Sequence, residues 1–440
     1  MEIDLKKRPA AATFASPVSP SYKWWVVFML WFVCFFNYAD RVALSAVFPR
    51  LKEEFGFDSF QLGLIGSAFM WVYAGAAPIA GFIGDRLRRR DLILGGFFFW
   101  SVITVTTGWA RTFWQFVTIR GLEGFGEAFY FPASMSLISD YHDRRTRSRA
   151  MSLHQSSVYI GTIAGGALGG FFAEYYGWRT GFYVFGGAGM VMALVLYFVL
   201  REPRRGQLEV EGAQETFGKE PSVSEVLKEF FRTPTALILL LVFVGANFVA
   251  MTFLTWMPTF LFEKFRLRLA MAGLAGTVFI QLASAVGAPL SGFLSDRLSQ
   301  WHPGGRMMLQ AAGLILGSSF IFLSGTTRDV GTLMLAMTIF GFSKGFYDAN
   351  IFASVYDVVH PRARATAVGI MNAVGWVGGA LAPATIGWIV SRGGAGNEVE
   401  NMSSAIAFGG VIYLGCALLL IVAILFFAKR DVVHHWGGYR

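Results

Sequence analysis

The stretch APIAGFIGDRL, residues 77–87, returns at 288–298 as APLSGFLSDRL. A longer pair follows: FYFPASMSLISDYHDRRTRSRA at 129–150 aligns without a gap with FYDANIFASVYDVVHPRARATA at 346–367. In these alignments Asp85 corresponds to Asp296, and Asp140 corresponds to Asp357. When stretches of one half of a chain recur in the same order in the other half, the two halves are expected to have the same fold.

The composition is that of a membrane protein with many spans. The chain is 55% hydrophobic and only 15% charged, and its mean hydropathy is +0.52. A helix needs about 20 apolar residues to cross a bilayer. Twelve candidate spans meet this need, at 24–48, 60–83, 92–110, 113–139, 149–173, 179–200, 235–261, 271–294, 307–325, 331–355, 365–391 and 403–428.

We therefore expect an all-α membrane protein with twelve transmembrane helices in two pseudo-symmetric six-helix bundles. Repeats in the same orientation, related by an axis along the membrane normal, are typical of transporters with a site near the midplane. The expected segments are an N-terminal tail at 1–23, a first bundle at 24–200, a linker at 201–234, a second bundle at 235–428 and a tail at 429–440. The linker ends in SVSEVLKEFF, whose Ser and Glu three residues apart predict a short interfacial helix.

The net charge of +9 follows the predicted topology. Lys and Arg gather in the even-numbered loops, for example DRLRRR and DRRTRSR, and in both tails, whereas the odd-numbered loops carry few. The positive-inside rule then places both termini in the cytoplasm. We expect the chain to lie in the cell inner (plasma) membrane. Because these basic residues follow the membrane topology and form no groove, we expect no nucleic-acid partner. The first span is too long for a signal peptide, so we expect it to be retained.

No sequence feature indicates an enzyme, a metal or a bound cofactor. Cys34 and Cys416 both lie in apolar spans, so no disulfide framework or redox motif follows from them. The expected energy source is a proton gradient. The expected partners are an anionic small molecule, protons and membrane lipid, and we expect the chain to act as a monomer.

The loop GFIGDRLRRR resembles the signature loop of the major facilitator superfamily, Gly-x-x-x-Asp-Arg-x-Gly-Arg-Arg, with Arg88 in place of the second Gly. YADR, RGLEGFGEAFYFPA and TFLTWMPTFL resemble the anion:cation symporter branch, which carries organic and sugar-acid anions with protons. The pattern Asn-Tyr-x-Asp-Arg, the pattern Gly-x-Gly-Glu-Ala-x-Tyr and the piece LREPRRG also resemble the spinster-like branch of lysolipid and sphingolipid carriers. The resemblance implies a proton-coupled symporter of a small organic anion, with a lipid carrier as the alternative.

Ionisable residues inside spans are expensive and usually functional. The first span carries Asp40 and Arg41 side by side, the fourth carries Arg120, Glu123 and Glu127, and the tenth carries Lys344 and Asp348. Such charges are tolerated where they face a watery cavity between the halves. The alternative is a static ion network that fixes helix packing.

Three of these acids are candidates for proton coupling. A carboxylate can exchange a proton where burial opposes its charge and a nearby cation favours it. Asp40, Glu127 and Glu123 meet that condition, and the last two lie four residues apart on one helix face. In the anion:cation symporter branch, the matching first-span Asp and fourth-span Glu are implicated in proton coupling, and the resemblance implies the same for Asp40 and Glu127.

An anionic substrate needs a fixed cation, and Arg41 is the first candidate because a guanidinium can hold a carboxylate through two hydrogen bonds. The repeat places Lys344 where Glu127 lies in the first half, so Lys344 is a second candidate. Each has a structural alternative: Arg41 neutralises Asp40 or Glu127, and Lys344 pairs with Asp348. The further candidates for substrate binding, each of which could also be a packing residue, are Asn37, Tyr38, Tyr73, Arg120, Tyr130, Gln155, Tyr347 and Asn372.

The two signature-like loops predict gating residues, because in the superfamily such loops latch the halves on the cytoplasmic side. The candidates are Asp85, Arg86, Arg89, Asp296 and Arg297, and the alternative is a charge cluster that serves topology alone. Gly161, Gly165 and Gly169 recur every fourth residue, which predicts close helix packing.

Overall fold

The computed structural model describes residues 21–84, 86–143, 145–203, 223–360, 363–392 and 397–436. Every regular element in these ranges is helical. The elements are α1 (Tyr22–Ala46), α2 (Phe48–Phe55), α3 (Ser59–Gly84), α4 (Arg89–Thr107), α5 (Phe113–Ala128), α6 (Tyr130–Tyr141), α7 (Arg147–Tyr175), α8 (Trp178–Val199), α9 (Val223–Arg232), α10 (Pro234–Phe265), α11 (Leu269–Ser299), α12 (Gly305–Thr326), α13 (Val330–Asp348), α14 (Ile351–Val358), α15 (Arg364–Ser391), α16 (Glu398–Val422), η2 (Ala423–Phe427) and α17 (Ala428–Trp436).

The predicted fold class is confirmed. Ten of the described segments are long and apolar enough to cross a membrane. The other two predicted spans are α4 and the pair α5–α6, and α5 is less apolar because it carries Arg120, Glu123 and Glu127. The fourth span is broken between α5 and α6, and the tenth is broken between α13 and α14. The short helix α2 was not predicted, whereas the helix predicted in the linker is present as α9.

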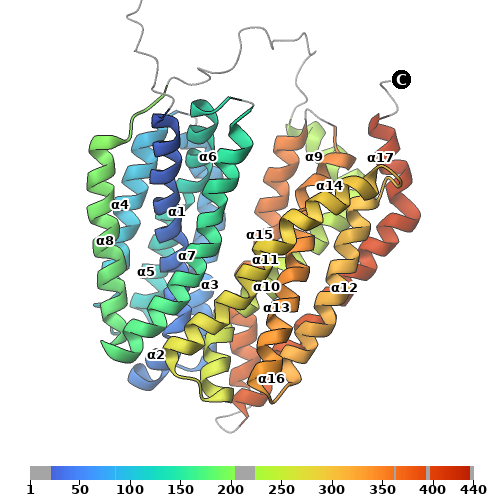
Figure 1. Cartoon of the computed structure of the whole chain (residues 1–440). Coiled ribbons are helices and arrows are strands. Elements are labelled where there is room, and N and C mark those ends of the chain that lie inside the picture. Colours follow the sequence, from blue (N-terminus) through green and yellow to red (C-terminus); the bar gives the residue numbers. More distant parts are fainter. Residues whose placement is uncertain are drawn as a thin grey trace, which may run out of the picture.

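The helices form two bundles, α1–α8 and α10–α17, which meet at one end and separate toward the other (Figure 1). Cross-bundle packing runs between α3 and α15 and between α7 and α11. We call the end near α2 the closed end and the end near α9 and α17 the splayed end. The junction between the bundles is therefore closed at one end and open toward the other.

Glycines allow the backbones of the two bundles to touch at the closed end. A Cβ atom on Gly166 of α7 would lie 2.5 Å from the carbonyl oxygen of Gly273 on α11, and one on Gly63 of α3 would lie 2.3 Å from the carbonyl oxygen of Pro383 on α15. Real Cβ atoms do not approach backbone this closely, so only glycine permits the observed contact. We call these two contacts the glycine seam.

The predicted glycine row packs within one bundle. A Cβ on Gly161 would lie 2.6 Å from the carbonyl oxygen of Phe35, and one on Gly165 would lie 2.3 Å from that of Ala39. These contacts press α7 against α1, the helix that carries Asp40 and Arg41. The neighbouring Gly166 faces the other bundle, so α7 uses two different glycine faces for two different partners.

Ion pairs reinforce the closed end. Lys52 of α2 binds Glu263 of α10 at 3.1 Å and also Glu398 of α16. Burial lowers the pKa of Lys52, but the two glutamates raise it, and the net direction is upward. Across the other contact, Glu174 of α7 accepts from Arg268 at 2.6 Å and from the backbone N–H of Ala270 at 2.9 Å. Charged groups of the two bundles thus bind each other at the closed end.

We predict that Gly166→Ala opens the closed end, because the new methyl group would clash with the Gly273 backbone. Spin labels on Tyr176→Cys and Arg266→Cys, two exposed positions on opposite bundles, should show a larger separation than in the parent. Gly187→Ala is the matched control, since nothing lies within 4 Å of its new methyl group. An unchanged separation in Gly166→Ala would contradict the seam.

Candidate functional site

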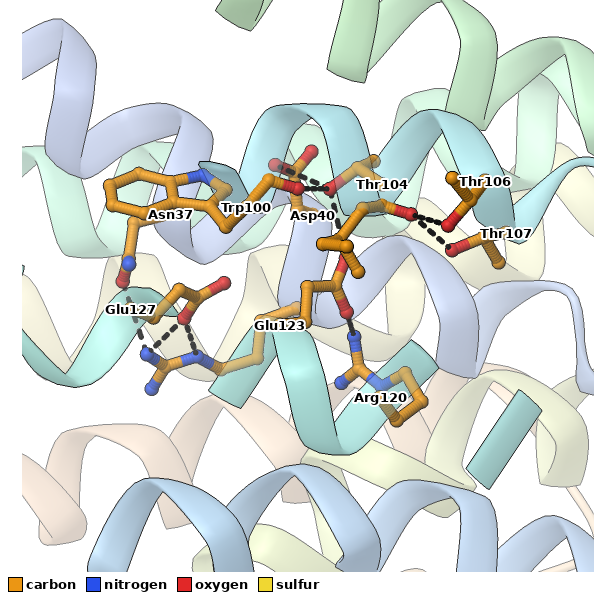
Figure 2. A network of polar contacts seen from close by, with 11 residues as sticks. Asn37, Asp40, Trp100, Thr104, Thr106, Thr107, Arg120, Glu123 and Glu127 are labelled. Carbon is orange, nitrogen blue, oxygen red and sulfur yellow. Dashed lines mark hydrogen bonds and ion pairs between the residues drawn. The ribbon is translucent and has the colours of Figure 1, made fainter. Parts of the chain in front are cut away.

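Helix spacing brings the charged residues of α1 and α5 to one place. Asn37 and Arg41 lie one turn apart on α1, and Glu123 and Glu127 lie one turn apart on α5. Figure 2 shows Asn37, Glu123 and Glu127 converging with Asp40 and with Thr104 of α4. All are nearly inaccessible to solvent: Asp40, Glu123 and Glu127 are each 1% exposed.

The first half of the network is an ion pair between Arg41 and Glu127. Arg41 Nη2 donates to Glu127 Oε2 at 2.6 Å, and Arg41 Nε donates to the same oxygen at 3.2 Å. The same Nη2 donates to Asn37 Oδ1 at 3.1 Å. The guanidinium also lies over the rings of Phe69 and Tyr38, 4.6 Å and 4.8 Å from their centroids. Arg41 is therefore held in one orientation by α1, α3 and α5.

The second half of the network joins Asp40 to Arg120 through Thr104. Thr104 Oγ1 lies 2.8 Å from Glu123 Oε1 and 3.4 Å from Asp40 Oδ2. Glu123 in turn pairs with Arg120. Asp40 has no ion-pair partner among the described residues, and its Oδ1 is buried without a hydrogen-bond partner. Asp40 is thus the one acid of the cluster that lacks a guanidinium of its own.

Both guanidiniums reach the junction between the bundles. A pocket of about 20 Å³ is lined by Arg41, Arg120 and Phe69 of the first bundle and by Met251, Leu254 and Thr255 of α10. The buried charge network of the first bundle therefore borders the second bundle directly. Within the described ranges, no group of three or more His, Cys, Asp or Glu has the arrangement needed to hold a metal ion.

Lys344 forms the local ion pair that is its structural alternative to substrate binding. It binds Asp348, one turn further along α13. The side chains stay accessible, with exposed fractions of 18% for Lys344 and 34% for Asp348. Tyr159 of α7, in the other bundle, is close enough to interact electrostatically with both. The second bundle thus presents its own charged pair toward the first.

The other predicted binding residues fall into two groups. Three of them are not enclosed within one bundle's apolar core. The ring centroid of Tyr73 lies 5.2 Å from the guanidinium of Arg41. The side chain of Gln155 is exposed, and that of Asn372 is half-buried. Tyr130 and Tyr347 are instead buried inside their own bundles. The Tyr130 hydroxyl donates to the Leu30 carbonyl at 2.7 Å, so in this conformation it supports packing.

The predicted gating residues lie at the splayed end, except that Asp85 lies outside the described residues. Arg89 pairs with Asp140, and Arg306 bridges Asp296 at 2.9 Å and Asp357 at 2.7 Å. The repeat-related Asp140 and Asp357 thus accept an arginine within their own bundles. Arg86 and Arg297 are exposed.

Thr104 and Phe69 were not predicted as site residues. A threonine and a phenylalanine in apolar spans carry no charge, and neither lies in a motif that the sequence repeats. Only the packing of α3 and α4 against α1 and α5 brings them to the network. Lys52, Glu263 and Glu398 were missed because their pairing joins α2 to distant helices.

Twelve spans in two repeated bundles, with a buried charge network at their junction, define the class of membrane transporters. A sequence model of the Major Facilitator Superfamily matches residues 30–383 and 267–437. The chain belongs to the Major Facilitator Superfamily, and the resemblance noted in the sequence is confirmed. Relatives named as sugar-acid transporters and relatives named as spinster homologues are both found among its matches.

One relative is the probable galactarate/D-glucarate transporter GudP of Bacillus subtilis (strain 168), 27% identical over 93% of this chain and 94% of that protein. Another is protein spinster homolog 1 of Rattus norvegicus, 29% identical over 68% of this chain and 59% of that protein. Among solved structures, a bacterial homologue of the human lysosomal transporter Spinster, in an inward-facing and unoccupied conformation, superposes with a TM-score of 0.77. It is 23% identical and covers 95% of this chain and 99% of its own, which supports the shared fold.

We predict that Arg41→Met destabilises the protein by about 3 kcal/mol, because Glu127 would remain as a buried charge without its partner. The double variant Arg41→Met with Glu127→Gln should recover about half of that loss. Thermal unfolding in one detergent measures both. A double variant no more stable than the single one would argue against a dominant ion pair.

Proposed function

We propose that the protein is a proton-coupled symporter of a small organic anion, a sugar acid or related carboxylate, that works by alternating access. The single observation that carries this proposal is the buried cluster in which three carboxyl groups, Asp40, Glu123 and Glu127, share two guanidinium groups, Arg41 and Arg120. Such a cluster can bind a proton and an anion in the same place.

The proton has a natural place in this cluster. If all three acids were ionised, one negative charge would remain uncompensated, and burying an unpaired charge costs several kcal/mol. Arg41 serves Glu127 and Arg120 serves Glu123, so Asp40 is the acid that carries the proton in this conformation. Glu127 is the second proton site, because its Oε1 is buried without a hydrogen-bond partner.

The anion has a natural place as well. Arg41 borders the pocket between the bundles, but Glu127 occupies its fork. A substrate carboxylate that enters must compete with Glu127 for Arg41. A proton on Glu127 removes that competitor and leaves the guanidinium to the substrate. Proton and anion therefore favour each other's binding, which is the thermodynamic requirement for symport.

Sugar acids are the favoured substrate class because relatives are named for them. These include the probable galactarate/D-glucarate transporters and the probable L-galactonate transporter of Escherichia coli (strain K12). Relatives named as spinster homologues support a second candidate, transport of a lysolipid, sphingolipid or other amphiphile.

The orientation follows from charge. The basic loops before α4, α7 and α12 lie at the splayed end, as do the start of α1 and the end of α17, so the positive-inside rule turns that end to the cytoplasm and the closed end outward. The structure would then represent an inward-facing state of a plasma-membrane carrier. We propose that it works as a monomer, since each chain holds both bundles and the whole charge cluster.

A thermal-shift screen of the purified protein tests the substrate class. Galactarate, D-glucarate, monocarboxylates, aromatic acids and lysolipids are each added over a range of concentrations. A specific ligand stabilises the folded state by an amount that grows with its concentration. Stabilisation by sugar acids supports the proposal, and stabilisation by lysolipids alone would favour the amphiphile carrier.

We predict that Asp40→Asn and Glu127→Gln each fold but lose pH-driven accumulation of the sugar acid in proteoliposomes. Each amide is close in shape to the acid that it replaces but cannot gain and release a proton. Exchange of substrate between the two sides can survive in one of them, because exchange does not require proton release. Full pH-driven accumulation by both variants would contradict the proton assignment.

We predict that Lys344→Gln weakens binding of the sugar acid about tenfold while changing the melting temperature little, because Lys344 supplies positive potential from the second bundle. Asp348→Asn is the matched control: it breaks the same pair but keeps the cation, so affinity should be retained. Equal affinities for Lys344→Gln and the parent, together with a clear loss of stability, would reduce Lys344 to a packing role.

A further inference from the structure

Thr104 has an unusual set of neighbours for a threonine in a transmembrane helix. Its side chain is fully buried. Its Oγ1 lies 2.8 Å from Glu123 Oε1, 3.0 Å from the Trp100 carbonyl oxygen and 3.4 Å from Asp40 Oδ2. Three acceptors thus surround one hydroxyl group (Figure 2).

The hydrogen count limits what these neighbours can be. A hydroxyl has one hydrogen to donate, whereas ionised carboxylates and carbonyl groups only accept. If Asp40 and Glu123 were both ionised, the hydroxyl could satisfy only one of them. If Asp40 carries a proton, that proton can be donated to Thr104 Oγ1, and the Thr104 hydrogen then goes to Glu123. The geometry therefore suits one proton shared between Asp40 and Glu123 through the Thr104 hydroxyl.

We propose that Thr104 is the positioning residue that couples protonation of Asp40 to the Glu123–Arg120 ion pair. In the relay step, a proton leaves Asp40 Oδ2 for Thr104 Oγ1 while the Thr104 hydrogen passes to Glu123 Oε1. One O–H bond breaks at Asp40 and one forms at Glu123, and Thr104 ends as a neutral hydroxyl. The inference rests on the proposed proton-coupled function.

This relay reaches the anion site. A neutral Glu123 no longer holds Arg120 by charge, and Arg120 lines the pocket between the bundles together with Arg41. The charged groups that act on Asp40 are Glu123, Glu127 and Arg120 of α5, beside Arg41 of its own helix. A proton that moves from Asp40 to Glu123 thus makes a second guanidinium available to the substrate.

The chain offers a matched control on the same helix. Thr107 is also buried, but its hydroxyl bonds to the Ile103 carbonyl of its own helix at 3.5 Å and to neither acid. Thr104→Val removes the shared hydroxyl with little change of shape, Thr104→Ser keeps a hydroxyl, and Thr107→Val removes a hydroxyl outside the network.

The test is an infrared pH titration of the protein in lipid, without substrate. The carbonyl band of protonated Asp40 is assigned by its loss in Asp40→Asn. In Thr104→Val the pH midpoint of this band should move by about one unit, and Thr104→Ser and Thr107→Val should stay near the parent. In addition, Glu123→Gln should change the midpoint less in the Thr104→Val background than in the parent, because the acids are then uncoupled.

The outcomes separate the two proposals. A parent-like midpoint in Thr104→Val, with a clear Asp40 band, would overturn the relay and leave proton coupling intact. Absence of any Asp40 band at every pH tested would overturn the proton site itself, and the relay with it. A purely structural Thr104 would lower the melting temperature of Thr104→Val without moving the midpoint.

Discussion

The site depends on a charge imbalance that the first bundle cannot resolve alone. Three buried carboxyl groups, those of Asp40, Glu123 and Glu127, face two guanidinium groups, and water is nearly excluded from all of them. The deficit is one positive charge, which one bound proton would supply. Both guanidiniums border the second bundle, so a change in the net charge of the cluster changes the electrostatic potential at the junction between the bundles. In the proposed mechanism, the cluster therefore links proton occupancy to anion binding.

The glycine seam and the ion pairs join the two bundles at the closed end, on one side of this cluster. Backbone contacts at Gly63 and Gly166 bring helices of the two bundles together, and Lys52 and Glu174 add charged contacts across the same junction. Apolar side chains pack across the same junction: the rings of Phe48 of α2 and Trp256 of α10 lie 5.7 Å apart, centroid to centroid, within a buried apolar cluster that both bundles share. In the proposed cycle, the charge cluster would become accessible from the other side of the membrane when the closed end opens and the splayed end closes.

Much of the fold could be predicted from the sequence, because spans follow from apolar length and the two bundles follow from the repeat. The charges of the site were also predictable, since Asp40, Arg41, Glu123 and Glu127 are costly in apolar helices. Their pairing was not: nothing in the sequence indicates that Arg41 binds Glu127 while Asp40 stands without a guanidinium. Thr104 was missed for the same reason, because a threonine becomes significant only when three helices meet around it.

In the proposed mechanism, anion and proton cross the membrane together, and a direct measurement of proton movement tests this coupling. Proteoliposomes that contain the protein and a trapped pH-sensitive dye are placed in an outward-to-inward gradient of galactarate at equal starting pH, with the membrane potential clamped. We predict that the interior acidifies as galactarate enters, and that it does not acidify in liposomes without the protein. Uptake of galactarate with no change of internal pH would contradict it.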